Sequence, residues 1–174
     1  HELTVPKTVW TGGAFDAGNN GNTLLIDILG KKLFDFPKSI KTVERCIHLS
    51  TDDEVSSLIL DYFGGSGTTG HAVLDLTEDD LENRQFILCT NDENKICTNI
   101  CYPRIKNVIQ GYTNAKNEKV EGLKGNLKYF KTDFVDGEPT DKNKKKLVEQ
   151  CTEMLCLKDD CFDEIKQTKT HSIF

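Results

Sequence analysis

Hydrophobic positions along this chain recur in two periods, one typical of helices and one typical of buried strands. Residues 40–47 carry apolar side chains at helical spacing, and Pro37 stands just before them, where proline favours a helix start. A shorter helix is predicted over 22–29, with Asn22 as its N-cap and Gly30 at its end. The apolar face of the longer helix consists of Ile40, Val43 and Ile47.

The centre of the chain has the most informative pattern. Residues 56–63, SSLILDYF, have the composition of a buried strand, and the glycine-rich segment GGSGTTG follows at once. Residues 71–76 then return to a helical period. The predicted order is therefore a strand, a glycine turn and a helix that begins near Thr68.

The alternation continues after this helix. Residues 84–90, RQFILCT, have the pattern of a second buried strand. A further helix is predicted over 97–110, and Gly111 ends it. Strands that alternate with helices indicate βαβ units and a parallel sheet, so the predicted fold class is α/β.

The C-terminal part of the chain is more polar. A strand is predicted over 127–135, LKYFKTDFV, and a helix over 142–157. The side chains that this helix is expected to bury are Leu147, Cys151, Met154 and Leu155. The predicted organisation is an opening loop or tail of a preceding region over 1–21, the main α/β part over 22–113, a polar linker over 114–125, and a C-terminal strand and helix over 126–174.

Length and charge limit the function classes. The 174 residues favour a single domain, and no run approaches 18 apolar residues, so neither a membrane span nor a signal peptide is expected. The 28 acidic and 22 basic side chains give a net charge of −6. Because phosphate binding depends on lysine and arginine, this stretch is not expected to be the main grip on a nucleic acid. Any DNA contact would be local or supplied by another part of the protein.

The cysteines indicate the redox environment. There are seven, an odd number, with no CxxC pair, which is typical of a reduced, cytoplasmic protein whose thiols are small core residues. Zinc sites favour two tight cysteine pairs, and only Cys97 and Cys101 come close to such a spacing. No metal site is expected.

The glycine turn is the candidate binding site. A strand that ends in Asp61 and turns through glycines into a helix brings backbone amides and the positive end of the helix dipole to one corner. The string GSGTTG, residues 65–70, matches GxGxxG, and its place between a strand and a helix strengthens that match. A P-loop is disfavoured because His71 stands where its lysine is needed.

Two ligand classes then compete for the corner. A dinucleotide site prefers an acidic residue at the end of the second strand, where Thr90 stands, with Asp92 and Glu93 shortly after it. The other class is S-adenosylmethionine, which combines an amino acid with a nucleoside. Motifs across the chain favour the second class.

Four segments carry a family resemblance. Residues 60–74, LDYFGGSGTTGHAVL, resemble the cofactor motif of amino-DNA methyltransferases, and residues 34–39, FDFPKS, are similar to the segment that precedes this motif in the beta-ordered group. Residues 84–94, RQFILCTNDEN, and 100–112, ICYPRIKNVIQGY, are similar to the C-terminal part of the modification (Mod) subunit of type III restriction-modification systems. The similarity extends from about Asn19 to the end of the chain.

The resemblance implies an incomplete Rossmann-like, S-adenosylmethionine-dependent methyltransferase fold, with 22–113 as its cofactor-binding part. Asp61 would meet the ammonium group of the methionine moiety, and Phe63 or Phe36 would cover an apolar or adenine face. The alternative is that both phenylalanines are ordinary core residues. The cofactor-binding residues implied are Phe36, Lys38, Asp61, Phe63, Gly65, Ser66, Gly67, Thr68 and Thr90.

The chain departs from the family pattern in two ways. Thr90 stands where a carboxylate usually holds both ribose hydroxyls, so either Asn91, Asp92 or Glu93 replaces it or ribose binding is weaker. The Asp/Asn-Pro-Pro-Tyr/Phe loop, which holds the flipped-out base, is absent because no two of the four prolines are adjacent. No catalytic residue is therefore assigned, and the chain is expected to be a C-terminal fragment of a longer subunit.

The implied activity is methyl transfer from S-adenosylmethionine to adenine N6 in double-stranded DNA. The implied partners are the remainder of the Mod polypeptide, the restriction (Res) subunit and a second Mod copy. The alternatives are an NAD-dependent oxidoreductase domain that uses Gly65, Gly67 and Gly70, or a non-catalytic assembly domain. The edge of the strand over 57–61 is expected to be covered by the rest of the subunit or by another copy.

Overall fold

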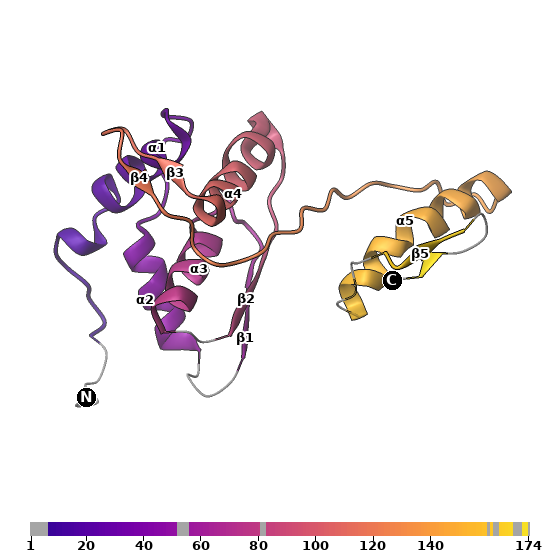
Figure 1. Cartoon of the computed structure of the whole chain (residues 1–174), viewed down its shortest axis with the longest axis horizontal. Coiled ribbons are helices and arrows are strands. Elements are labelled where there is room, and N and C mark those ends of the chain that lie inside the picture. The colour runs from indigo at the N-terminus through magenta and orange to yellow at the C-terminus, as the bar shows by residue number, and fades with distance from the viewer. Residues whose placement is uncertain are drawn as a thin grey trace. The chain divides into compact units, whose positions relative to one another are not determined.

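The computed structural model describes residues 7–51, 56–80, 83–159, 161, 164–168 and 172–173. The chain divides into two compact units, His1–Tyr129 and Phe130–Phe174, which are described separately (Figure 1). Residues 1–6 of the predicted opening loop lie outside the described residues. No helix of the described residues is long and apolar enough to cross a membrane.

The first unit is built on one βαβ motif. Strand β1 (Ser57–Asp61) leads through the glycine turn into helix α3 (Thr68–Asp80), and strand β2 (Arg84–Leu88) follows. The two strands pair in parallel, with Ser57 opposite Arg84 and Asp61 opposite Leu88. The predicted strand, turn and helix order is confirmed, and so is an α/β fold class with a parallel sheet.

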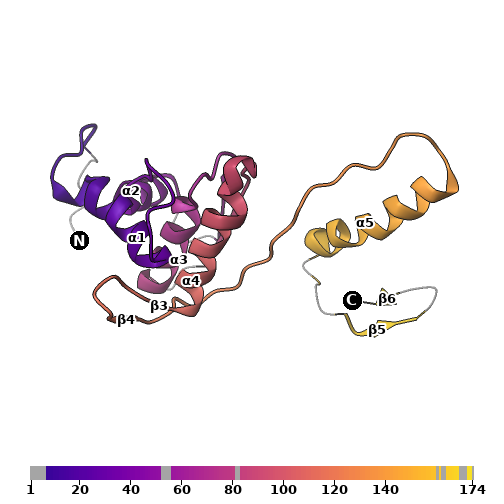
Figure 2. The same cartoon turned by 90° about the horizontal axis from the view of Figure 1, so that it is seen from above.

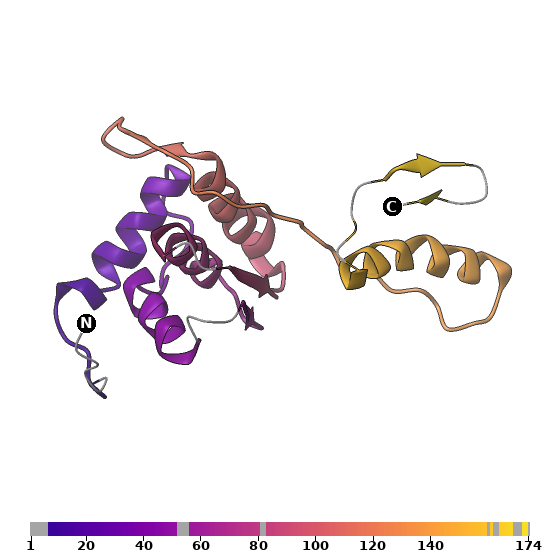
Figure 3. The same ribbon diagram turned by 60° about the horizontal axis from the view of Figure 1, so that its bottom comes forward.

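Helices cover one face of this two-stranded sheet (Figures 1 and 3). Helix α2 (Ile40–Ser50) packs on α3, and their shared core consists of Ile40, Ile47, Ala72, Val73 and Leu76. A π-helical turn over Cys97–Cys101 continues into α4 (Tyr102–Gln110), whose Ile105 and Val108 pack with Ile28 and Leu74. Within the described residues of the first unit, no element covers the opposite sheet face, and its exposed apolar side chains are Leu58, Leu60 and Ile87.

The first helix begins earlier than predicted. A π-helical turn over Gly18–Thr23 precedes α1 (Leu24–Leu29), so Asn22 lies within helical structure and does not cap it. Gly30 ends this helix at φ 74°, as predicted. The opening loop is tied to the segment before α2, because the Ser39 hydroxyl donates to the Ala14 carbonyl at 3.4 Å.

The segment after α4 is more ordered than the predicted linker. Strands β3 (Tyr112–Thr113) and β4 (Lys119–Val120) form an antiparallel hairpin near α1 and α4 (Figure 2). The Asn114 side chain organises its turn by accepting the backbone N–H groups of Lys116 at 2.9 Å and Glu118 at 3.0 Å. This short hairpin is held by local hydrogen bonds of one side chain, and such bonds leave no hydrophobic pattern in the sequence.

Two predictions for the C-terminal part are wrong. Residues 127–135 form no strand, because no other described segment pairs with them. Helix α5 (Asp141–Asp159) is present, but its predicted buried face is not: Leu147 is 50% exposed and Met154 is 69% exposed. The other described elements of this unit are only the two-residue strands β5 (Lys166–Gln167) and β6 (Ser172–Ile173), which offer little surface to pack against.

Candidate functional site

The glycine turn between β1 and α3 is held in a conformation that ordinary side chains adopt rarely. Gly65 has φ +51° and Gly67 has φ +78°, and a Cβ on Gly67 would lie 3.1 Å from the Cys101 sulfur. The Gly67 N–H donates to the Gly64 carbonyl at 2.7 Å, and the Gly64 N–H donates to the Cys89 carbonyl at 2.9 Å. The turn is therefore fixed both internally and to the end of β2.

Asp61, the last residue of β1, braces the same turn. Its carboxylate accepts the Phe63 N–H at 3.0 Å and the Thr69 hydroxyl at 2.6 Å. A carboxylate has about four acceptor positions, so two remain for another donor. The group thus joins the strand end to the first turn of α3 and keeps capacity for a ligand.

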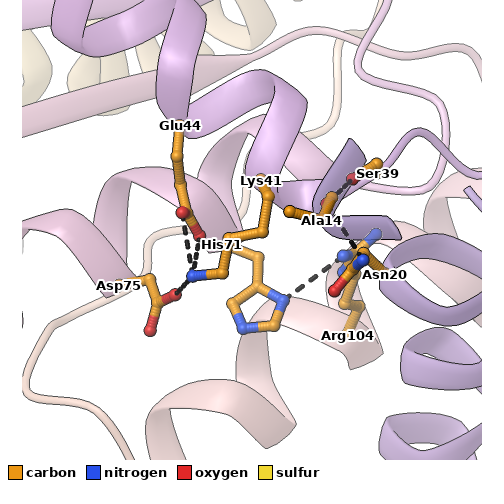
Figure 4. Close-up of polar contacts among 8 residues, drawn as sticks. All are labelled: Ala14, Asn20, Ser39, Lys41, Glu44, His71, Asp75 and Arg104. Atoms are coloured by element: carbon orange, nitrogen blue, oxygen red, sulfur yellow. Dashed lines mark hydrogen bonds and ion pairs between the residues drawn. The ribbon is translucent and has the colours of Figure 1, made fainter. Parts of the chain in front are cut away.

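Arg104 supports the turn from the protein interior. Its side chain is fully buried, and Nη1 donates to Thr68 Oγ1 at 2.8 Å and to the Ser66 carbonyl at 3.4 Å. Nη2 contacts His71 Nδ1 at 3.3 Å (Figure 4). Burial, and secondarily the charge of Arg104, lower the pKa of His71 to about 3, so the ring is neutral and its Nδ1 accepts this bond.

A cavity of about 440 Å³ opens beside the turn, at the carboxyl ends of the two parallel strands. Binding sites in open α/β sheets commonly lie at these strand ends. Aromatic rings, one glycine and a polar edge meet here. The lining residues are Phe34, Tyr62, Phe63, Gly65, Cys89, Thr90, Asn91 and Ile96.

The structure brings most of the predicted residues to this corner. Phe63, Gly65 and Thr90 line the cavity directly. Asp61 and Gly67 shape the turn, while Ser66 and Thr68 are buried beneath it and contact Arg104.

Phe36 and Lys38 are not brought into the cavity lining. The Phe36 side chain is 86% exposed, and Lys38 is also exposed. Phe34, two residues earlier, lines the cavity instead, and its ring edge lies 3.9 Å from where a Gly65 Cβ would stand. The part assigned to Phe36 and Lys38 in cofactor binding stays a prediction.

The three candidates for the missing ribose carboxylate are placed differently. Asn91 lines the cavity. Asp92 accepts the Thr98 N–H at 3.0 Å and the Thr98 hydroxyl at 3.1 Å, and these bonds, led by the backbone one, lower the pKa of Asp92. Glu93 is exposed in the short helical turn that follows. Asn91 is thus the one of the three that borders the cavity.

Sequence reasoning missed Arg104, although a signal for it existed. The residue lies on the apolar face of its helix, at the spacing that joins Cys101, Ile105 and Val108. A lone arginine within such a face needs buried hydrogen-bond partners. The cavity-lining residues that were also missed are Phe34, Tyr62, Cys89 and Ile96.

Comparisons with known proteins identify relatives of the chain. Residues 2–100 match a family model described as DNA methylase. The StyLTI type III restriction-modification Mod subunit of Salmonella typhimurium is 40% identical over 77 residues, which are 44% of this chain and 12% of that protein. The EcoPI Mod subunit of Escherichia phage P1 is 38% identical over 88 residues, covering 51% of this chain and 13% of that protein.

A third relative aligns with more of the chain. The type II methyltransferase M.KpnI of Klebsiella pneumoniae is 29% identical over 135 residues, which are 78% of this chain and 32% of that protein. The chain therefore spans a minor part of the length of each of these relatives.

Proposed function

Because the chain belongs to the DNA methylase family, whose model matches residues 2–100, we propose that it supplies the cofactor pocket of a DNA adenine-N6 methyltransferase. The methyl donor would be S-adenosylmethionine, bound in an incomplete Rossmann-like fold. The observation that carries this proposal is the cavity at the ends of β1 and β2, which joins aromatic rings to a fixed glycine turn.

The residues of the cavity suit this cofactor. The rings of Phe34 and Phe63 can cover an adenine, and Thr90 and Asn91 offer hydroxyl and amide groups to a ribose. The unused acceptor positions of Asp61 suit the ammonium group of the methionine moiety. A cavity of about 440 Å³ is in the size range of small-molecule sites.

The chain's own residues contribute positioning to the reaction. The bound cofactor supplies an activated methyl group on its sulfonium, so the protein must orient this group toward the target amine and exclude water. Asp61 fixes one end of the cofactor through its ammonium group, and the aromatic rings fix the other. The Asp-Pro-Pro-Tyr loop that holds the base would come from another part of the polypeptide, since no such loop occurs in these 174 residues.

The proposed partners follow from the relatives. Two of them are Mod subunits of type III restriction-modification enzymes. We therefore propose that the chain works with the remainder of a Mod polypeptide, with double-stranded DNA and with a Res subunit. A second Mod copy is the proposed oligomeric partner.

Ligand-dependent thermal stability tests the cofactor assignment. A ligand that binds only the native state raises the melting temperature, and saturation at 100 times Kd adds about 2.7 kcal/mol. S-adenosylhomocysteine and S-adenosylmethionine should stabilise the protein that contains this chain, whereas NAD should not. Stabilisation by NAD alone would support the oxidoreductase alternative and overturn the proposal. Failure of all three ligands would support an assembly domain.

A further inference from the structure

Arg104 is a buried cation whose observed partners are all neutral. None of its surface is exposed, and its guanidinium contacts the Ser66 carbonyl and hydroxyl, the Thr68 hydroxyl and the His71 ring. Within the described part of the chain, no carboxylate forms an ion pair with it, and Nε has no hydrogen-bond partner. Removing a charge from water is costly when no opposite charge accompanies it.

The charge itself persists at neutral pH. Burial lowers the pKa of Arg104 to about 10, which still leaves the guanidinium protonated. The neutral His71 ring supplies no negative charge to offset it. The carboxylates of Glu44 and Asp75 lie nearby, but their ion-pair partner is Lys41 (Figure 4). They therefore do not pair with Arg104.

The glycine turn lies between this charge and the cavity. Ser66 contacts Arg104 on the interior side of the turn, and Gly65 borders the cavity on the other. The turn also leads into α3, a helix of 13 residues, whose first N–H groups have no intrahelical acceptor. The buried guanidinium and the helix dipole therefore raise the potential of the same few backbone groups.

We propose that Arg104 is a positioning residue that holds Ser66 and Thr68 in place and makes the turn selective for a ligand that carries a carboxylate. This inference rests on the proposed function and deepens it, since the ligand's carboxylate would be that of the methionine moiety. An anionic group at the turn compensates the uncompensated charge of Arg104 through a protein interior of low dielectric constant. Arg104 thus acts on the cofactor through the turn and does not touch it.

Two ligands that differ in the amino-acid part separate this role from a purely structural one. S-adenosylhomocysteine carries the carboxylate, whereas its decarboxylated analogue, S-adenosyl-3-thiopropylamine, keeps the adenosine, the thioether and the ammonium group without it. Their Kd values are measured by calorimetry on the full-length protein that contains this chain. The variants are Arg104→Met, Arg104→Gln and Arg104→Lys, and the control is Val108→Ala, a buried residue one helical turn further along α4 that packs in the core with Ile28.

The neutral variants should lose the preference for the carboxylate. Arg104→Met is expected to weaken S-adenosylhomocysteine binding about tenfold or more, while binding of the decarboxylated analogue changes less than about twofold. Arg104→Gln keeps an N–H donor for Thr68 and should show the same loss, which covers the case in which the Met variant does not fold. Arg104→Lys keeps the charge and should retain most of the preference, and Val108→Ala should leave both Kd values unchanged.

Other outcomes would overturn the inference. An equal loss for both ligands in the neutral variants, or no loss for either, would limit Arg104 to packing. A Lys variant that loses the preference as fully as the Met variant would exclude the charge as its cause. If the wild-type protein binds neither ligand, the proposed function itself fails, and that result is distinct from a failure of the Arg104 assignment.

Discussion

At the scale of single residues, Asp61 has a structural role in the glycine turn and a proposed role in cofactor binding. Its carboxylate joins the end of β1 to α3 through bonds to the Phe63 N–H and the Thr69 hydroxyl. The family resemblance alone assigned it only to the ammonium group of the cofactor. The structure adds that removing the whole side chain would also release the turn, so an alanine variant does not test cofactor binding by itself.

Two substitutions of Asp61 should therefore differ. Asp61→Asn can keep an acceptor for the Phe63 N–H and place its amide toward the Thr69 hydroxyl, so its free energy of unfolding should change by less than about 1 kcal/mol. Asp61→Ala should lose about 1–3 kcal/mol, because bonds to a charged group disappear. Both variants should weaken the binding of S-adenosylhomocysteine at least about tenfold, since the ion pair between Asp61 and the ammonium group is lost. Normal affinity in the Asn variant would contradict the assignment to the ammonium group.

Glu44 is a second residue of interest, because its environment should make the stability of the protein depend on pH. It is a residue of α2, where Lys41 Nζ contacts its carboxylate at 2.9 Å and that of Asp75 on α3 at 3.4 Å (Figure 4). Burial raises the pKa of Glu44 from its usual 4.5 to about 7, with Lys41 opposing the rise and Asp75 reinforcing it. The native state therefore holds this proton more tightly than the unfolded chain does.

The sign of the resulting pH dependence is fixed by linkage. A raised native pKa stabilises the fold below pH 4.5, and this contribution is lost as the pH rises from 4.5 to about 7. Glu44→Gln cannot titrate, so its free energy of unfolding minus that of the wild type should increase across this window and level off above it. Urea unfolding at several pH values measures the difference. A difference that stays constant from pH 4 to 8 would show that Glu44 titrates alike in both states.

At the scale of elements, the site depends on the close packing of α3 against β2 and α4. Gly70, in the first turn of α3, is the point of closest approach: an added Cβ would lie 2.9 Å from Leu88 Cδ1 and 3.0 Å from Ile105 Cδ1. These atoms belong to the second strand and to the helix that carries Arg104. Any shift of α3 therefore moves the glycine turn relative to its support.

Gly70→Ala should destabilise the protein despite the better helix propensity of alanine. Overpacking costs about 1–3 kcal/mol, and the propensity gain offsets about 1 kcal/mol or less, so a net loss of about 1–2 kcal/mol is expected. Gly13→Ala is the matched control, because an added Cβ there meets nothing within 4 Å, and it should change stability by less than about 0.5 kcal/mol. Denaturant unfolding of both variants makes the comparison. An unchanged Gly70→Ala variant would contradict the packing described.

The elements that could be predicted from sequence are those with a strong local signal. Residues 56–76 combine a run of buried-strand residues, a glycine cluster and a helical period, and each of these depends only on near neighbours. Residues 127–135 show the limit of this reasoning. Their composition suits a strand, but a strand needs a partner, and no described segment supplies one.

The candidate site shows the same division. The turn glycines are detectable because their conformation requires a residue without a side chain. Arg104 was missed because arginine is usually exposed, and its buried contacts join residues more than 30 positions apart in the sequence. Phe34 lines the cavity and Phe36 is exposed. The path of the backbone decides between these two identical residue types, and the sequence pattern does not show that path.

At the scale of the whole molecule, the sheet is the open feature: within the described residues of the first unit, helices cover only one of its faces. Parallel sheets in α/β proteins normally have helices on both faces. Here Ile59 and Phe86 pack against the helical core, whereas Leu58 and Leu60 are 62% and 60% exposed on the other face. β1 also has no described strand on its second edge. We infer that another part of a longer polypeptide, or a second copy, covers this face and edge.

Neighbouring positions on β1 can test this inference in the full-length protein. If only one face of the sheet is covered, Ile59→Ser should lower the free energy of unfolding, whereas Leu60→Ser should leave it within about 0.5 kcal/mol of the wild type. Val9→Ser is the exposed control and should also stay within this range. On a sheet covered on both faces, truncating Leu60 removes buried apolar contacts and should cost about 2 kcal/mol or more, similar to Ile59. We expect the second result, because an exposed apolar sheet face and an unpaired strand edge both favour association and aggregation. A Leu60→Ser variant as stable as Val9→Ser would show that this face remains exposed in the complete protein.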